Sequence, residues 1–220
     1  MAHAHVTAWT PALRGHGGLV RPIDFRRLVG GPAWRSLPHA VQQRFGPAAH
    51  LTPTRYEGEM VVRASRAGWL LAQACRLLGT PLAPWIGEAV PVTVEVHTDA
   101  RGALVWDRTY GFAGRTPVRV SSRKVLGRSG ELMEVIQGGL GMTLVVTVEA
   151  GALHFRSTGY FLKVAGLRLP IPGLATPGAA HVIHQDAGDG WFRFTLSFAH
   201  RLAGETFFQT GLFRDPGETP

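Results

Sequence analysis

The sequence predicts an α+β protein in which N-terminal helices pack on a strongly curved antiparallel β-sheet or β-barrel. From Val90 onward, short runs of alternating polarity follow one another and are separated by turn residues. The connections are only a few residues long, which favours antiparallel pairing over parallel units with crossover helices. Two shapes satisfy these observations, a lipocalin-like barrel and a helix-grip cup, and both leave a mouth that can take a small molecule.

The composition indicates one globular domain over residues 1–220. Hydrophobic residues make up 45% of the chain and charged residues 17%, which is too apolar for a disordered protein. The 28 glycines and 15 prolines suit many strands that are joined by turns. Within this domain we expect residues 1–20 to be loosely ordered, residues 21–88 to form a helical layer plus the first strand, and residues 89–213 to form the antiparallel sheet or barrel.

The helices are predicted in the N-terminal part of the chain. Residues 23–29 and 38–45 can each form a short helix, and the second is expected to leave Arg44 to solvent. Residues 57–65 alternate enough to form a first strand. Residues 68–78 predict a helix that is apolar on most sides, so it either packs on the sheet or contacts a membrane or a lipid ligand.

Nine strands are predicted beyond residue 89. Alternation is clearest over residues 142–148 and 192–198, where four apolar side chains share a face in each case. Residues 166–178 contain three prolines and are expected to form a rigid connection that crosses or rims the sheet. The predicted strands cover residues 90–97, 103–111, 117–125, 131–137, 140–149, 152–164, 179–186, 190–200 and 205–213.

The chain is strongly basic, with a net charge of +8 and a pI of about 10.9. The basic residues are scattered, and no recognisable nucleic-acid motif is present, so nucleic acid is not an expected partner. The N-terminus lacks the regions of a signal peptide, and no apolar run approaches the roughly 20 residues that span a bilayer. We therefore expect a soluble bacterial protein of the cytoplasm without a membrane span.

An arginine on an apolar strand face is the most informative feature of the sequence. Trp106, Arg108 and Tyr110 alternate with polar residues and therefore share one face of a predicted strand. Glu134 and Ser122 occupy apolar faces of the next two strands. A charge on such a face needs a partner or a ligand. In a meander of three strands, the backbones of Arg108 and Glu134 lie about 10 Å apart, with Ser122 between them.

Two interpretations of this polar group stay open. In the first, Arg108 and Glu134 form a structural buried ion pair with Ser122 as a relay. In the second, the group is the polar end of an apolar pocket. Arg108 then binds a carboxylate or enolate oxygen, and Glu134 serves as a base whose pKa burial raises.

Other chemistries find no support in the motifs. His181 and His184 are three residues apart on a predicted strand and face opposite sides, so no metal site is predicted. The chain has no nucleophile elbow, phosphate loop or dinucleotide fingerprint, and no cofactor is expected. Cys75, the single cysteine, excludes an intrachain disulfide and is expected to be a buried, unreactive thiol.

Several short patterns between Phe25 and Phe213 together resemble a bacterial family known as domain of unknown function 4166. The resemblance implies a β-rich fold and a reductase as a neighbour, because the family occurs alone or fused to a saccharopine-dehydrogenase-like reductase. This chain resembles a stand-alone member that lacks the reductase half. It departs from the usual pattern at Phe45, where histidine is common, at Arg168 and Arg201, where prolines are common, and at Gln209, where an aromatic residue is common. The matching patterns are Leu37-Pro38, Tyr56-x-Gly58, Arg63, Val90-Pro91-Val92-Thr93-Val94, Trp106-x-Arg108-x-Tyr110-Gly111, Ser122, Glu134, Gly166-Leu167-Arg168-Leu169-Pro170, Asp189-Gly190-x-Phe192-x-Phe194 and Gly204 with Gly211.

The sequence leaves three functions open. The favoured one is a cytoplasmic domain that binds a lipid-like or polyketide-like molecule by its carboxylate or carbonyl, with an accessory role beside a reductase. The second is a cofactor-free isomerase or cyclase with Glu134 as base and Arg108 as electrostatic stabiliser. The third is a structural or oligomerising domain, and its oligomeric state is not predicted. A cavity of several hundred cubic ångströms would support binding or catalysis, whereas an interior filled with side chains would support the structural role. The predicted ligand-binding residues are Trp106, Arg108, Tyr110, Ser122, Glu134, Phe192 and Phe194.

Overall fold

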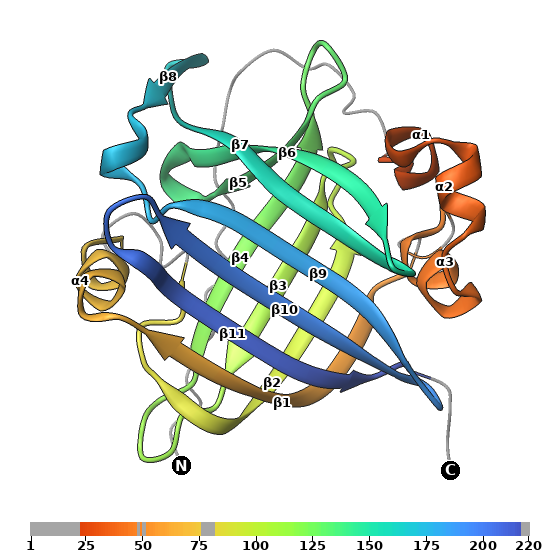
Figure 1. The fold of residues 1–220 in the computed structure, drawn as a ribbon, viewed down its shortest axis with the longest axis horizontal. Helices are drawn as coiled ribbons and strands as arrows, with labels where there is room; N and C mark the ends of the chain where they lie inside the picture. Colours follow the sequence, from red (N-terminus) through yellow and green to blue (C-terminus); the bar gives the residue numbers. More distant parts are fainter. Residues whose placement is uncertain (1–22, 48, 50–51, 76–81, 217–220) are drawn as a thin grey trace.

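Ten antiparallel strands close into a barrel in the computed structural model (Figure 1), which describes residues 23–47, 49, 52–75 and 82–216. Around the barrel the strands follow the order β6-β5-β4-β3-β2-β1-β11-β10-β9-β7, and the pairing of β6 with β7 closes the ring. The closed barrel therefore replaces the alternative of a helix-grip cup. The strands are β1 (Thr54–Ala64), β2 (Gly87–Thr98), β3 (Leu104–Tyr110), β4 (Val118–Leu126), β5 (Leu132–Ile136), β6 (Leu140–Glu149), β7 (Ala152–Val164), β9 (Ala179–Gly188), β10 (Trp191–His200) and β11 (Gly204–Arg214).

The pairing of β1 with β11 joins the first strand to the last one. Two glycines allow this close contact. A Cβ atom on Gly58 would lie 2.1 Å from the backbone oxygen of Leu212, and one on Gly211 would lie 2.4 Å from that of Glu59. Side chains at these positions would push the two strands apart, so glycine is required where the ring closes.

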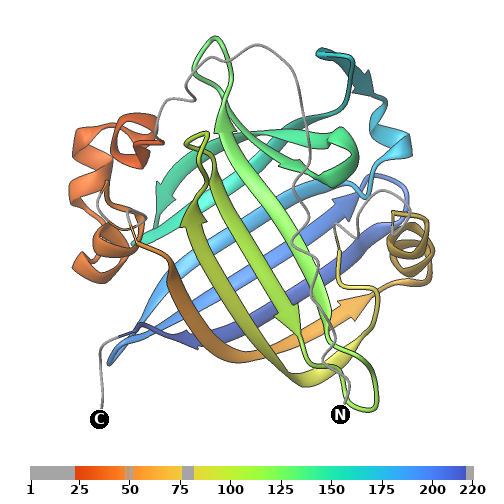
Figure 2. The same cartoon turned by 180° about the vertical axis from the view of Figure 1, so that it is seen from behind.

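Three short helices cover one end of the barrel, and a fourth lies at the other end (Figures 1 and 2). These are α1 (Phe25–Val29), α2 (Gly31–Arg35), α3 (His39–Phe45) and α4 (Arg66–Cys75). The predicted helices at 23–29 and 38–45 correspond to α1 and α3, whereas α2 was not predicted. Its start is marked by Pro32 in the first turn, where proline suits a helix because its missing N–H has no helical partner there.

The barrel interior is lined by the alternating apolar faces that the sequence predicts. Phe192, Phe194 and Phe198 are buried, and Leu196 packs against the same core. Helix α3 adds Val41 and Phe45, and α1 adds Phe25. The Phe25 ring meets those of Phe45 and Phe155 edge-on, with centroids 5.3 and 5.8 Å apart. The helical cap is thus part of the barrel core rather than a separate layer.

Parts of the fold differ from the sequence prediction. The connection at 166–178 contains a short eleventh strand, β8 (Leu167–Ile171), which pairs only with the end of β7 outside the ring. Ala165 and Gly166 have positive φ angles and make the tight turn of this hairpin. Residues 1–20, the predicted end of the helix at 76–78 and the Cys75 side chain lie outside the described part of the structure.

Candidate functional site

A chain of polar side chains crosses three neighbouring strands inside the barrel. The guanidinium of Arg108 donates a hydrogen bond from Nη1 to Ser122 Oγ over 3.4 Å. Ser122 in turn hydrogen-bonds Glu134, and Glu134 Oε2 lies 3.2 Å from Lys124 Nζ. All four side chains are buried. The structure therefore contains the predicted Ser122 relay, but the direct ion pair joins Glu134 to Lys124.

The first interpretation expects a direct ion pair between Arg108 and Glu134, but the strand register gives Glu134 a different partner. On β4, Lys124 lies directly opposite Glu134 of β5. Arg108 lies opposite Val120, four residues from Lys124 along the same strand. Lys124 therefore takes the nearest position to the carboxylate, and alternation from Ser122 to Lys124 places both on the interior face.

This arrangement leaves a positive charge inside the barrel. Arg108 and Lys124 are cationic, and within the described residues Glu134 is the one carboxylate that pairs with either of them. Besides its hydrogen bond to Ser122, the Arg108 guanidinium lies near two aromatic rings, with its Cζ atom 5.5 Å from the Trp106 ring centroid and 5.7 Å from that of Phe194. A buried guanidinium without a carboxylate partner is costly, and an anion placed beside it would remove that cost.

The two buried partners have shifted pKa values. Burial alone would raise the pKa of Glu134, but the nearby charges of Lys124 and Arg108 outweigh burial and lower it. The pKa of Lys124 is lowered, chiefly by burial, with Glu134 acting in the opposite direction. The expected rise of the Glu134 pKa is therefore wrong, and Glu134 is an ionised partner of Lys124.

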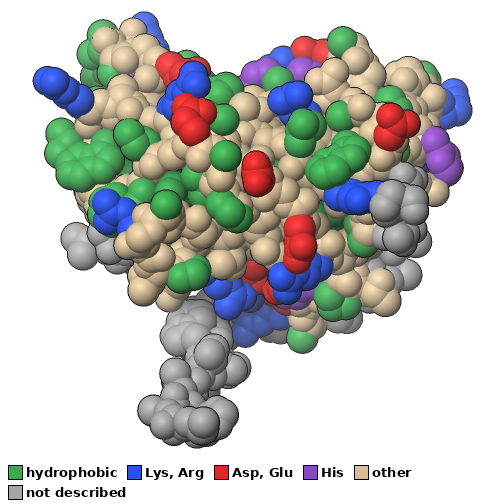
Figure 3. All heavy atoms as spheres, turned by 90° about the horizontal axis from the view of Figure 1, so that it is seen from below, with side chains coloured by type: hydrophobic (Ala, Val, Ile, Leu, Met, Phe, Trp, Pro, Cys, Tyr) green, Lys and Arg blue, Asp and Glu red, His purple; other side chains and the backbone are tan. Residues whose placement is uncertain are grey.

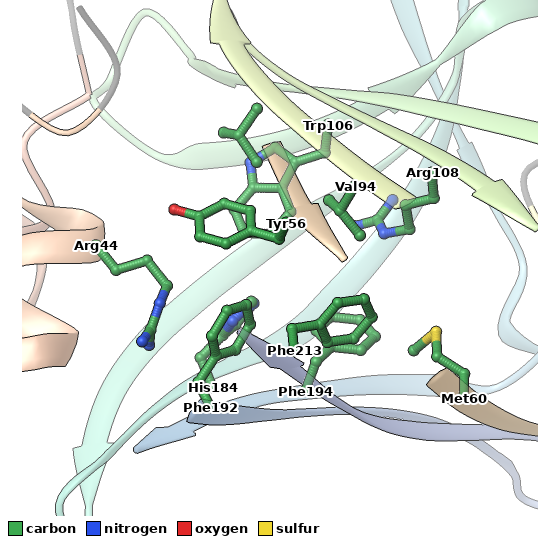
Figure 4. A pocket seen from close by; sticks show the side chains of 11 residues that line it. Arg44, Tyr56, Met60, Val94, Trp106, Arg108, His184, Phe192, Phe194 and Phe213 are labelled. Carbon is green, nitrogen blue, oxygen red and sulfur yellow. The ribbon is translucent and has the colours of Figure 1, made fainter. Parts of the chain in front are cut away.

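The centre of the barrel holds a small cavity between aromatic side chains (Figure 4). Its volume is about 20 Å³, which is room for about one water molecule. A cavity of several hundred cubic ångströms is absent from the centre of the described barrel, since side chains fill the interior. The lining residues are Arg44, Tyr56, Met60, Val94, Val96, Trp106, Arg108, His184, Phe192, Phe194 and Phe213.

Three of the cavity-lining residues have buried polar atoms without a hydrogen-bond partner. These atoms are Trp106 Nε1, His184 Nδ1 and Arg44 Nη1. Buried polar atoms in native proteins nearly always have a partner, and each one without a partner costs free energy. The three residues line a cavity with room for about one water molecule, so a bound water or the polar end of a ligand could satisfy these atoms.

His184 lies among five aromatic rings. Its ring centroid is 4.8 Å from that of Phe45, 5.2 Å from that of Trp106 and 5.1 Å from that of Phe194, and the rings of Phe155 and Phe192 are also in contact. Burial first, and then the charges of Arg44, Lys124 and Arg108, hold the pKa of His184 well below its ordinary value. His184 is therefore neutral, and among the described residues its buried Nδ1 atom has no hydrogen-bond partner.

Helix α3 closes the barrel mouth through two consecutive residues. The Arg44 guanidinium stacks 3.9 Å from the Phe192 ring centroid and forms an ion pair with Asp215, with Arg44 Nε 3.0 Å from Oδ1. Arg44 is buried, so the expectation that it faces solvent is wrong. Phe45 points into the barrel against Trp106 and His184. Figure 4 shows Arg44 and Arg108 on opposite sides of the cavity.

All seven predicted ligand-binding residues face the barrel interior, but only four of them line the cavity. Trp106, Arg108, Phe192 and Phe194 do so. Tyr110 lies deeper and donates its hydroxyl hydrogen to Gln209 Oε1 over 3.0 Å. Ser122 and Glu134 reach the cavity only through Arg108. Sequence reasoning missed Arg44, Lys124 and His184 as members of the site, although alternation places the last two on interior faces.

The described residues show neither a metal site nor a membrane-spanning helix. In these ranges, no three His, Cys, Asp or Glu side chains come close enough together to hold a metal ion. His181 and His184 face opposite sides as predicted, since His181 contacts His154, with His154 Nδ1 2.9 Å from His181 Nε2. Within the same ranges, no helix is both long and apolar enough to cross a membrane.

The family model for domain of unknown function 4166 matches residues 37–213, which include the barrel and helix α3. The chain belongs to this family. The match confirms the resemblance seen in the sequence and covers every residue that lines the cavity. A search of curated proteins gives no match.

Two solved structures are weakly similar to this member of the family. One is a mutant of the fluorescent protein UnaG, with a TM-score of 0.34, 12% identity, and coverage of 75% of this chain and 96% of that chain. The other is described as a thioesterase II from Thermobifida fusca YX, with a TM-score of 0.24, 12% identity, and coverage of 80% and 84%. Neither similarity is strong enough to transfer a ligand or an activity.

Proposed function

We propose that the barrel binds a small apolar molecule, lipid-like or polyketide-like, by a carboxylate or carbonyl group. The binding residues are Arg108, Trp106 and His184, with Phe192 and Phe194 as apolar walls. A carboxylate beside Arg108 accepts charge-assisted hydrogen bonds from the guanidinium. A second acceptor atom of the same ligand meets the indole N–H of Trp106.

The observation that carries this proposal is the surplus positive charge inside the barrel. Lys124 and Glu134 compensate each other, whereas within the described part of the chain Ser122 is the one hydrogen-bond partner of Arg108. A barrel that served only as a scaffold would be more stable with an apolar residue at position 108. The three cavity atoms without hydrogen-bond partners support the same conclusion, because a bound acceptor would satisfy them.

By the cavity criterion given in the sequence analysis, the filled interior favours the structural role, and the binding proposal rests instead on the buried charge of Arg108. A ligand must therefore displace side chains to enter. The end of the barrel covered by α1, α2 and α3 is the natural entrance for a ligand. Phe45 of α3 occupies the barrel mouth there, and Asp215 holds Arg44 in position. Outward movement of α3 would remove the Phe45 ring from its position against Trp106 and His184. The ligand's apolar body would then occupy the space of that ring, with its polar end toward Arg108.

The geometry gives the enzymatic alternative no specific support. An isomerase or cyclase needs Glu134 as a base, but Glu134 is ion-paired with Lys124 and does not line the cavity. The accessory role beside a reductase and the cytoplasmic location stay predictions. The binding function itself requires neither of them.

Calorimetric titration with a matched pair of probes tests the proposal. Decanoate and decanol share an apolar chain and differ in the charge of the polar end. We expect decanoate to bind at least about tenfold more tightly than decanol, because hydrogen bonds between charged groups contribute ~1.5–3 kcal/mol. Arg108→Met should abolish this preference.

Arg123→Met is the matched control, because Arg123 also lies on a barrel strand but forms its ion pair with Asp99 at 3.0 Å. This variant should bind decanoate like the unchanged protein. The proposal fails if decanoate and decanol bind equally, if neither binds, or if Arg108→Met and Arg123→Met have the same effect.

A further inference from the structure

Exposed apolar side chains gather at the end of the barrel that carries α4. In the described residues, most of the large hydrophobic side chains that are exposed belong to this end. Leu167 is 67% exposed, Leu174 68% and Leu202 81%. We name the group the apolar rim and define it as Trp69, Leu70, Ile86, Leu167, Leu174 and Leu202.

The segments that carry the apolar rim are neighbours in space. The backbone N–H of Ser65, just before α4, donates to the carbonyl of Thr206 on β11. The hydroxyl of Thr206 donates to the carbonyl of Pro177, which follows the turn with Leu174. A Cβ atom on Gly178 would lie 2.3 Å from the backbone of Ala199, before the turn with Leu202. Figures 1 and 2 show α4, the β10–β11 turn and β8 along the same side of the barrel.

Helix α4 shows how the fold leaves apolar side chains outside. Gly68 lies against the backbone of Thr206, where a Cβ atom would be 1.8 Å from its carbonyl oxygen, and Ala72 is buried. These small residues bring one face of α4 onto the barrel. Trp69 and Leu70 therefore point away from it and, with Ile86, border an open groove of about 400 Å³.

The apolar rim is accompanied by positive charge. The segments 62–70, 84–88, 163–175 and 199–206, together with Glu131, which pairs with Arg168, contain five basic and three acidic residues, a surplus of two positive charges. Arg66 and Arg201 are exposed next to rim residues, and Arg66 also borders the groove. Figure 3 shows hydrophobic and basic side chains together at the left edge of the molecule, on the side of α4.

We infer that the apolar rim docks this protein on the surface of a membrane that contains anionic lipids. Apolar side chains on a helix and separate turns can each enter the boundary between headgroups and acyl chains, while basic side chains contact the anionic headgroups. Trp69 suits this position, because indole rings favour the membrane interface. The groove beside Arg66 is placed to accept part of an acyl chain. This inference does not depend on the ligand-binding proposal, because the rim lies outside the barrel cavity.

Vesicle flotation tests the inference on the full chain. We expect the protein to float with vesicles of phosphatidylcholine mixed with phosphatidylglycerol and to bind vesicles of phosphatidylcholine alone more weakly. Added salt should weaken binding to the mixed vesicles by screening. The double variant Leu174→Ser/Leu202→Ser should lose binding by about tenfold or more, because two leucines no longer bury apolar surface. Arg66→Gln/Arg201→Gln should reduce the preference for mixed vesicles.

Val145→Ser is the control, because Val145 is an exposed apolar residue on β6, away from the rim. Its binding should equal that of the unchanged protein, and thermal melts of all variants should show that they fold. No binding to mixed vesicles, or an equal loss in the Val145 variant, would overturn the inference. So would a dimer that lacks vesicle binding and dissociates in the leucine variant, because the rim would then bind a second copy of this chain.

Discussion

Lys124 decides the charge balance of the barrel interior. It neutralises Glu134 directly and leaves Arg108 with a hydroxyl as its polar partner. A lysine one strand away from the carboxylate therefore changes the role of the arginine. In an ion pair with Glu134, Arg108 would have a structural role. Without that pair, its guanidinium is the natural contact for an anionic ligand.

Removing the Glu134 charge should destabilise the fold strongly. Glu134→Gln leaves Lys124 and Arg108 as two buried cations without a carboxylate, and we expect a loss of about 3–5 kcal/mol in the free energy of unfolding. The double variant Glu134→Gln/Lys124→Met should recover much of this loss. Urea denaturation of the two single variants, Glu134→Gln and Lys124→Met, and of the double variant measures these changes. A double variant as unstable as the sum of the two single variants would show that the pair is not coupled.

His184 should make stability depend on pH. Its pKa is well below the ordinary value in the folded protein, whereas in the unfolded chain it is about 6.5. Below about pH 6.5 the unfolded chain therefore binds the additional proton, and stability falls as the pH decreases toward the folded pKa. His184→Phe should reduce the difference in stability between about pH 7.5 and about pH 5.5.

His181→Asn serves as the comparison for this measurement. The pKa of His181 is also lowered, chiefly by burial, but its side chain is more exposed than that of His184. We expect its replacement to remove a smaller part of the pH dependence. An unchanged pH dependence in His184→Phe would mean that His184 is not the buried neutral group described above.

At the level of elements, α3 acts as a plug. Phe45 is 1% exposed and contacts rings from three strands of the barrel. We expect Phe45→Ala to cost about 3–5 kcal/mol, because it leaves a cavity in the core. The same change should strengthen decanoate binding, because the ligand no longer has to displace the ring. Lower stability in thermal melts together with tighter decanoate binding in titrations would show that Phe45 of α3 closes the barrel.

A core substitution elsewhere separates the effect of opening the entrance from a general loss of core packing. Phe207 is equally buried, but it lies on β11 and its ring contacts Phe198, whereas Phe45 contacts the cavity-lining Trp106 and His184. Phe207→Ala should lower stability to a similar degree without strengthening the binding of decanoate. Tighter binding in both variants would argue against α3 as the entrance.

At the level of the whole molecule, local patterns predict the strands well but not the closure of the ring. Alternation and turn residues locate β6 and β10, because successive side chains of a strand point to opposite faces and the interior face is apolar. The pairing of β1 with β11 joins residues such as Met60 and Gly211, which are far apart in the sequence, and no local pattern specifies it. The extra strand β8 was missed because a proline-rich segment predicts an irregular connection.

In the candidate site, too, local patterns predict which side chains face the interior but not which of them become partners. The interior positions of Trp106, Arg108 and Glu134 follow from alternation, because a barrel strand has only two faces. The partner of Glu134 depends on the register between β4 and β5, which side-chain patterns do not reveal. The sequence predicts a solvent-exposed Arg44, because the helical pattern alone does not show that α3 packs over the barrel mouth. The packing of α3 turns Arg44 toward the barrel instead.

If the barrel holds an organic anion at Arg108, native mass spectrometry of protein purified from its own cells should detect that anion. We predict that the unchanged protein carries a small apolar acid, and that protein with Arg108→Met, prepared in the same way, does not carry it. If both proteins are free of ligand, or if the Arg108→Met protein retains the same bound molecule, then Arg108 does not hold an organic anion in the barrel.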